Sequence, residues 1–190
     1  MTDIFVAGEG AGEIGRWVEP RERRETSQRT DGVLFEIYSR KRADGCVIDG
    51  VAWSKIPKYR AGGHATADQR TLRKLAVIAE EAGADTFLWA RDSDHDASRV
   101  RALSKEHDDL RAKHAPALEI IGGVVEPCLE AWIVGLKGLH PNPEELSVPR
   151  LWQMAKDNGV EREEAMVAVV REAELSSGTV PSLKRWLDQF

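Results

Sequence analysis

Acidic residues follow two apolar runs that lie far apart in the chain. Glu9 comes soon after the first run, Ile4–Ala7, and Glu13 lies four residues further on; Asp92 and Asp94 come soon after the second run. A buried strand of a parallel sheet delivers the residues at its end to the carboxyl edge, where α/β proteins bind ligands. Carboxylate oxygens suit Mg²⁺ or Mn²⁺. If the two strands are neighbours, the four acids converge on a candidate metal site suited to phosphate chemistry.

The glycines around Glu9 allow two other interpretations of the first turn. Gly10–Gly15 matches the G-x-G-x-x-G pattern of dinucleotide-binding turns. Carboxylates at Glu9 and Glu13 would repel a phosphate there, and Asp49 lies beyond the usual offset of about 20 residues for the acid that holds a ribose. A phosphate-binding loop of the G-x-x-x-x-G-K-[ST] type is excluded because no lysine follows these glycines. The carboxylates themselves are therefore the candidate functional groups.

The acidic stretch after the second run begins like a calcium-binding EF-hand loop. That loop needs glycine at its sixth position and glutamate at its twelfth, where this chain has Ala97 and Leu103. Asp92 and Asp94, as alternate residues at a strand end, can point to the same side and share one ion. Asp96 is either a further ligand or the N-cap of the following helix.

Strands that alternate with helices would bring these acids together. Strands are expected at residues 3–7, 46–53, 86–90 and 118–125, and helices at about 11–18, 31–44, 65–82, 97–113 and 127–136. We expect Asp31 to cap the second of these helices, Gly45 to end it and Pro127 or Cys128 to open the last one. This order predicts an α/β fold with a mostly parallel, four-stranded, Rossmann-like sheet flanked by helices.

The pattern changes after residue 138. His140–Pro143 is a break, and only helices are expected beyond it, near residues 148–158, 161–174 and 180–189. We therefore divide the chain into an α/β domain over residues 1–138 and a helical C-terminal appendage over residues 139–190 that packs on it.

A basic loop follows the second expected strand and carries candidate substrate-binding residues. These are Lys55, Lys58, Arg60 and His64. At the carboxyl end of a strand they would lie near the acids, where cations bind a polyanion and offset charge in its transition state. The alternative is an ordinary solvated loop.

The ordered acids resemble the TOPRIM family of topoisomerases, primases and OLD-type nucleases, and small prokaryotic TOPRIM-like proteins in particular. The resemblance covers roughly residues 3–135 and includes the glutamate-alanine-tryptophan step that begins at Glu130. It implies a TOPRIM-like sheet, a general acid/base or metal ligand at Glu9, metal-binding aspartates at Asp92 and Asp94, and further ligands at Glu13 and Glu130.

Two departures from the family limit what the resemblance implies. Ala11 and Gly12 replace the proline and the threonine or serine that are common in the first motif. Tyr38 and Tyr59 lack the context of a topoisomerase tyrosine, so strand passage through a phosphotyrosine is not expected.

The function expected from this pattern is Mg²⁺- or Mn²⁺-dependent hydrolysis of phosphodiester bonds in DNA or RNA. Glu9, Asp92 and Asp94 are the catalytic candidates, and the resemblance adds a possible role in phage defence or as a toxin. The alternative is a non-catalytic module that binds a metal or a nucleotide and acts as a regulatory or interaction subunit with a protein partner.

Composition excludes several other classes of protein. The 190 residues are 42% hydrophobic, include six tryptophans and contain no apolar run long enough to cross a membrane, so we expect a folded cytoplasmic protein. Residues 1–74 carry 14 Lys/Arg against 11 Asp/Glu, a net +3, and residues 75–190 carry 13 against 21, a net −8. The acidic second part favours a protein surface over a nucleic-acid surface. Cys46 and Cys128 are expected to be structural residues.

Overall fold

Four parallel strands form the central sheet of the computed structural model, which describes residues 1–18, 28–57, 65–114, 117–175 and 180–190. The strands are β1 (Thr2–Gly8), β4 (Gly45–Ala52), β5 (Thr86–Asp92) and β6 (Glu119–Val125), in the order β4-β1-β5-β6. The predicted α/β class and parallel four-stranded sheet are confirmed. Because β1 and β5 are direct neighbours, their carboxyl ends lie side by side.

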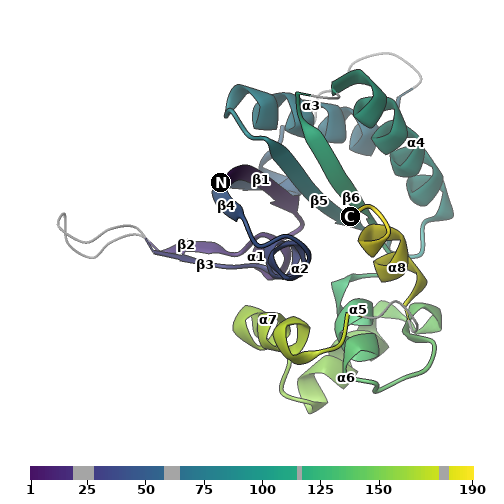
Figure 1. Ribbon diagram of the computed structural model, residues 1–190. Helices are drawn as coiled ribbons and strands as arrows, with labels where there is room; N and C mark the ends of the chain where they lie inside the picture. The colour runs from purple at the N-terminus through teal and green to yellow at the C-terminus, as the bar shows by residue number, and fades with distance from the viewer. Residues whose placement is uncertain (19–27, 58–64, 115–116, 176–179) are drawn as a thin grey trace.

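Helices cover both faces of this sheet (Figure 1). They are α1 (Ala11–Ile14), α2 (Val33–Lys41), α3 (Ala67–Glu81), α4 (Ala97–His114), α5 (Leu129–Leu136), α6 (Val148–Asp157), α7 (Glu163–Glu172) and α8 (Pro181–Leu187). Short 3₁₀ turns lie at Trp53–Lys55 and Pro143–Glu145, and β2 (Arg16–Val18) pairs with β3 (Gln28–Thr30) in a separate antiparallel ribbon.

The strands are apolar along their length because each face of the sheet is buried by a different set of helices. On one face Ile4, Val6 and Leu88 pack with side chains of α2, α5, α7 and α8. On the other face Phe5 and Phe87 pack with side chains of α3 and α4. The alternation of side chains along a strand thus divides the core into two layers that hold the strand ends in place.

The last helices follow the predicted order and complete one of these layers. Leu183 and Trp186 of α8 belong to the same buried cluster as Ile4 and Val6 of β1. The indole Nε1 of Trp186 donates to the carbonyl of Trp89 in β5, at 3.2 Å. Residues 139–190 therefore contribute directly to the packing of the sheet. No helix of the described segments is long and apolar enough to cross a membrane.

The structure corrects four sequence-based expectations about element ends. The first helix stops at Ile14, not near residue 18, because Gly15 has a φ of 80° and turns the chain into β2. Gly32, not Asp31, is the N-cap of α2, and Gly45 opens β4 after α2 has already ended at Lys41. Pro127 precedes the N-cap Cys128 and therefore lies outside α5.

Candidate metal centre

The carboxyl edge of the sheet brings together acids from three elements. Glu9 follows β1, Glu13 lies in α1, and Asp92 is the last residue of β5. Glu13, Glu9, Glu130 and Asp94 all act electrostatically on Asp92. The fold thus gathers the five acids that the sequence singles out as metal-ligand candidates.

Asp92 is the most perturbed acid of this group. It is largely withdrawn from solvent, and its Oδ1 atom is buried without a hydrogen-bond partner among the described residues. Burial, followed by the charges of Glu13, Glu9, Glu130 and Asp94, raises the pKa of Asp92 to about 9. A buried carboxylate with an unused oxygen is costly unless a proton or a cation neutralises it.

Glu13 is the second buried acid, with only 6% of its surface exposed. Its Oε2 atom accepts a hydrogen bond from the backbone N–H of Gly10 at 2.9 Å, which closes the turn between β1 and α1. Burial raises the pKa of Glu13 to about 7, with smaller upward effects from Glu9 and Glu130 and an opposing effect from backbone hydrogen bonds. Asp92 and Glu13 therefore both hold protons more tightly than isolated carboxyls do.

The close approach of α1 to β1 requires a glycine at position 8. A Cβ atom on Gly8 would lie 2.4 Å from the Cβ of Glu13. We expect Gly8→Ala to displace Glu13 and to lower the free energy of unfolding by about 1–3 kcal/mol, measured by chemical denaturation. Gly10→Ala is the matched control, because a Cβ there meets only Glu13 Oε2 at 3.9 Å. Equal effects of the two substitutions would contradict this account of Gly8.

Two arginines neutralise the outer acids. Arg91 Nη1 forms an ion pair with Glu9, and Arg99 Nη1 lies 2.7 Å from Asp94 Oδ2. Asp68 in the first turn of α3 joins the two pairs, 3.9 Å from Arg91 Nη2 and 3.0 Å from Arg99 Nε. The result is a continuous ionic chain, Glu9–Arg91–Asp68–Arg99–Asp94, along one side of the buried acids.

Arg91 is held in this chain by its surroundings as well as by charge. Its guanidinium carbon lies 5.4 Å from the centre of the Trp53 ring, and its side chain is 16% exposed. Arg91 immediately precedes Asp92 in β5, and its ion pair with Glu9 makes it a salt-bridge partner of a candidate metal ligand.

Asp94 and Asp96 have different roles after β5. Asp94 has a φ of 50°, its side chain is 58% exposed, and it faces Arg99. Asp96 accepts hydrogen bonds from the backbone N–H groups of Ser98 and Arg99, at 2.8 and 3.1 Å, and so caps α4. Of the two interpretations of Asp96, the structure supports the helix cap.

The other acidic and basic residues near the carboxyl edge differ in their relation to the cluster of acids. Burial raises the pKa values of Asp92, Glu13 and Cys128, and Glu130 in the first turn of α5 adds to each of these shifts. Glu126, which lies four residues before Glu130, forms an ion pair with Arg185 of α8. Lys55 is exposed at the end of the 3₁₀ turn after β4. Lys58, Arg60 and His64 fall outside the described residues, so their predicted role in substrate binding stays a prediction.

The carboxylates of this cluster are the kind of ligand that a hard divalent cation prefers. Two of them, Glu9 and Asp94, form ion pairs with arginines. Within the described parts of the chain, no three acid, histidine or cysteine side chains stand ready to hold a metal ion. Glu9 and Asp94 instead face arginines, while the unpartnered Asp92 Oδ1 supplies an oxygen ligand of the kind that Mg²⁺ and Mn²⁺ prefer. Binding an ion would therefore require Glu9 or Asp94 to exchange an arginine for the cation.

Asp68 and Arg99 are site residues that the sequence analysis misses. Asp68 is distant in sequence from the other acids and looks like an ordinary acidic first-turn residue of α3. Arg99 did leave a signal, because an arginine in the first turn of a helix opposes the helix dipole and needs a partner.

No family profile matches the chain, and no curated protein or solved structure matches it significantly.

Proposed function

We propose that the acids at the carboxyl edge bind Mg²⁺ or Mn²⁺ and that the chain hydrolyses phosphodiester bonds in nucleic acid. The observation that carries the proposal is the half-buried Asp92, whose Oδ1 atom is buried without a hydrogen-bond partner among the described residues and which four other acids affect electrostatically. Asp92 and Glu13 would hold the ion from the buried side, with Glu9, Asp94 and Glu130 as further ligands. The resemblance to TOPRIM nucleases points to the same chemistry.

The cation, the acids and the arginines would have different roles in hydrolysis. A bound divalent cation supplies Lewis-acid polarisation of a phosphoryl oxygen and lowers the pKa of water. Asp92 and Glu13 would give up their protons on binding it. Arg91 and Arg99, released from Glu9 and Asp94, would then be free to offset the negative charge of a phosphate.

A panel of substrates tests this function. Plasmid, single-stranded DNA, RNA and tRNA would be incubated with the protein in Mg²⁺ or Mn²⁺ and in EDTA. We expect metal-dependent cleavage of at least one, lost in Glu9→Gln and retained in Asp96→Asn. The second variant is a matched control, since asparagine caps a helix about as well as aspartate. Cleavage that persists in EDTA or in Glu9→Gln would contradict the proposal.

The ionic chain makes a separate prediction about Arg91. Arg91→Gln removes the cation that holds Glu9, so we expect Mn²⁺ to bind about tenfold more tightly, which corresponds to roughly 1.4 kcal/mol. Cleavage should fall, because an arginine that can offset phosphate charge is lost. Mn²⁺ affinity is measured by titration calorimetry. Weaker Mn²⁺ binding in this variant would mean that Arg91 only supports the shape of the site.

The pairing of Glu9 and Asp94 with arginines favours a second candidate function, a regulatory or interaction module without cleavage. In this state two proposed ligands are neutralised by the protein itself. Trp152 on α6 is 58% exposed and offers an apolar contact for a protein partner. Mn²⁺ binding without cleavage of any member of the panel would support this candidate over the nuclease.

A further inference from the structure

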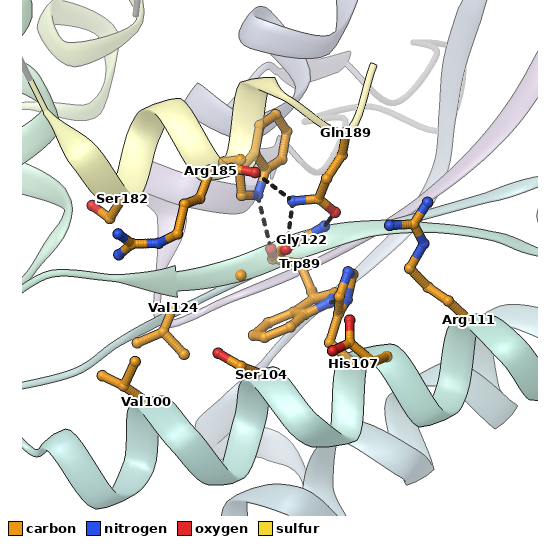
Figure 2. A pocket seen from close by; sticks show the side chains of 13 residues that line it. Trp89, Val100, Ser104, His107, Arg111, Gly122, Val124, Ser182, Arg185 and Gln189 are labelled. Carbon is orange, nitrogen blue, oxygen red and sulfur yellow. Dashed lines mark hydrogen bonds between the residues drawn. The ribbon is translucent and has the colours of Figure 1, made fainter. Parts of the chain in front are cut away.

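A cavity of about 240 Å³ lies along the outer edge of β6, between α4 and α8 (Figure 2). β6 ends the strand order of the sheet, so no strand of the described chain pairs with this edge. Ser104 and Arg111 reach the cavity from α4, and Ser182 and Arg185 reach it from α8. None of these four residues belongs to the proposed metal centre.

Among the β6 residues that line the cavity, one backbone position has no hydrogen-bond partner in the described part of the chain. Gly122 exchanges two hydrogen bonds with the Gln189 side chain, at 3.0 and 2.9 Å, and the Glu126 N–H donates to Ser182 Oγ at 3.3 Å. Alternate residues of a parallel strand direct both backbone groups to the same edge, so Val124 directs its N–H and C=O outward as well. Neither group has a hydrogen-bond partner among the described residues. Val124 therefore presents an adjacent donor and acceptor at the floor of the cavity.

The spacing along β6 restricts what can bind there. At about 3.3 Å per residue, roughly 13 Å separate Gly122 from Glu126. An added peptide strand would pair with positions 122, 124 and 126, but side chains of Gln189 and Ser182 already occupy the first and last. A single donor–acceptor pair remains. It suits a small planar ligand with a matching pair on one edge, as a nucleobase has.

Two indole rings flank this edge, one on each face of β6. A Cβ atom on Gly122 would lie 2.2 Å from Trp89, so this glycine lets the Trp89 ring pack close to the strand. A Cβ atom on Gly123 would lie 3.8 Å from Trp186, an ordinary van der Waals contact, so the Trp186 ring does not require a glycine there. Trp89 Nε1 donates to Nδ1 of His107 at 3.1 Å. Burial, with a smaller effect from Arg111, lowers the pKa of His107 to about 4, which keeps this nitrogen an acceptor at neutral pH.

Two arginines, Arg111 and Arg185, line the cavity against one acid, Asp108, and this balance favours an anionic group. Arg111 forms no ion pair with any described residue, and Arg185 pairs with Glu126 through one of its five N–H donors. Figure 2 shows Arg185 above the strand near Val124 and Ser104 below it. An arginine and a hydroxyl at the mouth of the cavity are groups that bind phosphate.

We propose that this cavity binds a nucleoside monophosphate, with its base paired to the backbone of Val124 and its phosphate held by Arg185 or Arg111. The proposal does not depend on the metal centre or on cleavage. It gives the chain a nucleotide site on the edge of the sheet, separate from the carboxyl edge.

Binding of AMP, GMP, CMP and UMP, followed by tryptophan fluorescence and calorimetry in EDTA, tests the proposal. We expect at least one to bind with a Kd below about 1 mM, or more favourably than roughly −4 kcal/mol. Val124→Pro removes the outward N–H without breaking the ladder to β5, and it should weaken binding about tenfold. Ser104→Trp, which fills the cavity from the surface of α4, should abolish binding. Replacing Arg185 and Arg111 together by glutamine should weaken the monophosphate more than the nucleoside.

Asp92→Asn is the control and should bind the nucleotide as the wild type does. Thermal unfolding of each variant shows whether it is folded. If Val124→Pro does not fold, Ser104→Trp alone tests whether the nucleotide binds in the cavity. The proposal is overturned if no nucleotide binds at millimolar concentration or if binding survives Ser104→Trp. Loss of binding in Asp92→Asn would also overturn it, since the ligand would then belong to the metal centre.

Discussion

Asp92→Asn is expected to abolish cleavage and at the same time to stabilise the protein. Replacing the carboxyl removes a candidate metal ligand, and we expect metal-dependent cleavage to fall by roughly 10²–10³-fold or more. The same change removes a buried acid that burial and neighbouring charges keep from ionising. We therefore expect the free energy of unfolding at pH 8 in EDTA to rise by about 1–3 kcal/mol. Cleavage assays and urea denaturation of the same preparation measure the two effects.

This opposition between activity and stability separates a functional acid from a structural one. If Asp92 mainly held the fold together, Asp92→Asn would lower stability and activity together. The control is Asp96→Asn, the same chemical change four residues away at an exposed helix cap. It should leave both quantities close to those of the wild type. A destabilised Asp92→Asn protein would remove the main support for the proposed site.

The stability of the metal-free protein should depend on pH through the same buried acids. Unfolded aspartate and glutamate have pKa values of about 4, whereas folded Asp92 and Glu13 have values of about 9 and about 7. Between about pH 4 and pH 9 the folded state thus holds protons that the unfolded state has released. The contribution of these two groups to stability is fully present below about pH 4 and is lost as pH rises, through about 7 for Glu13 and about 9 for Asp92.

The difference in the free energy of unfolding between the wild type and Asp92→Asn separates the effect of Asp92 from that of the other titratable groups. In EDTA the stability advantage of Asp92→Asn should grow by up to about 1 kcal/mol per pH unit between pH 5 and pH 8. Mg²⁺ should reduce that advantage, because a ligand that binds only the folded wild type stabilises it. Denaturation curves at four pH values measure both. An advantage that stays constant with pH would show that Asp92 is ionised throughout.

The strands could be predicted because the apolar runs that mark them are local features of the sequence, whereas the order of the strands in the sheet came only from the structure. The run Phe87–Ala90 is apolar throughout, as a strand covered on both faces must be, and β5 lies where that run does. The sequence predicts a first helix that runs to about residue 18, and the structure ends it at Ile14, because Gly15 has a φ of 80°. A glycine after a helical pattern predicts a helix end at Gly45, but this residue opens β4, where it pairs with Thr2 of β1.

The acids of the site could be predicted for a similar reason, but their partners could not. Glu9 follows one strand and Asp92 ends another, and chain order predicts that both belong to a parallel sheet. The two acids were expected to converge if these strands are neighbours, and β1 and β5 are neighbours. The ionic chain joins them to Asp68, Arg91 and Arg99 through contacts between four separate elements. Sequence spacing carries no information about such contacts. The raised pKa values depend likewise on burial that only the packed structure supplies.

Titration of the protein with Mn²⁺ at pH 8, in two buffers of different ionisation enthalpy, tests the central claim that these acids form a cation site. Asp92 is mostly protonated at this pH and must ionise to bind the ion, so we predict saturable binding with release of about one proton. The release should disappear in Asp92→Asn and persist in Asp96→Asn. An absence of binding, or binding that Asp92→Asn leaves unchanged, would contradict the account.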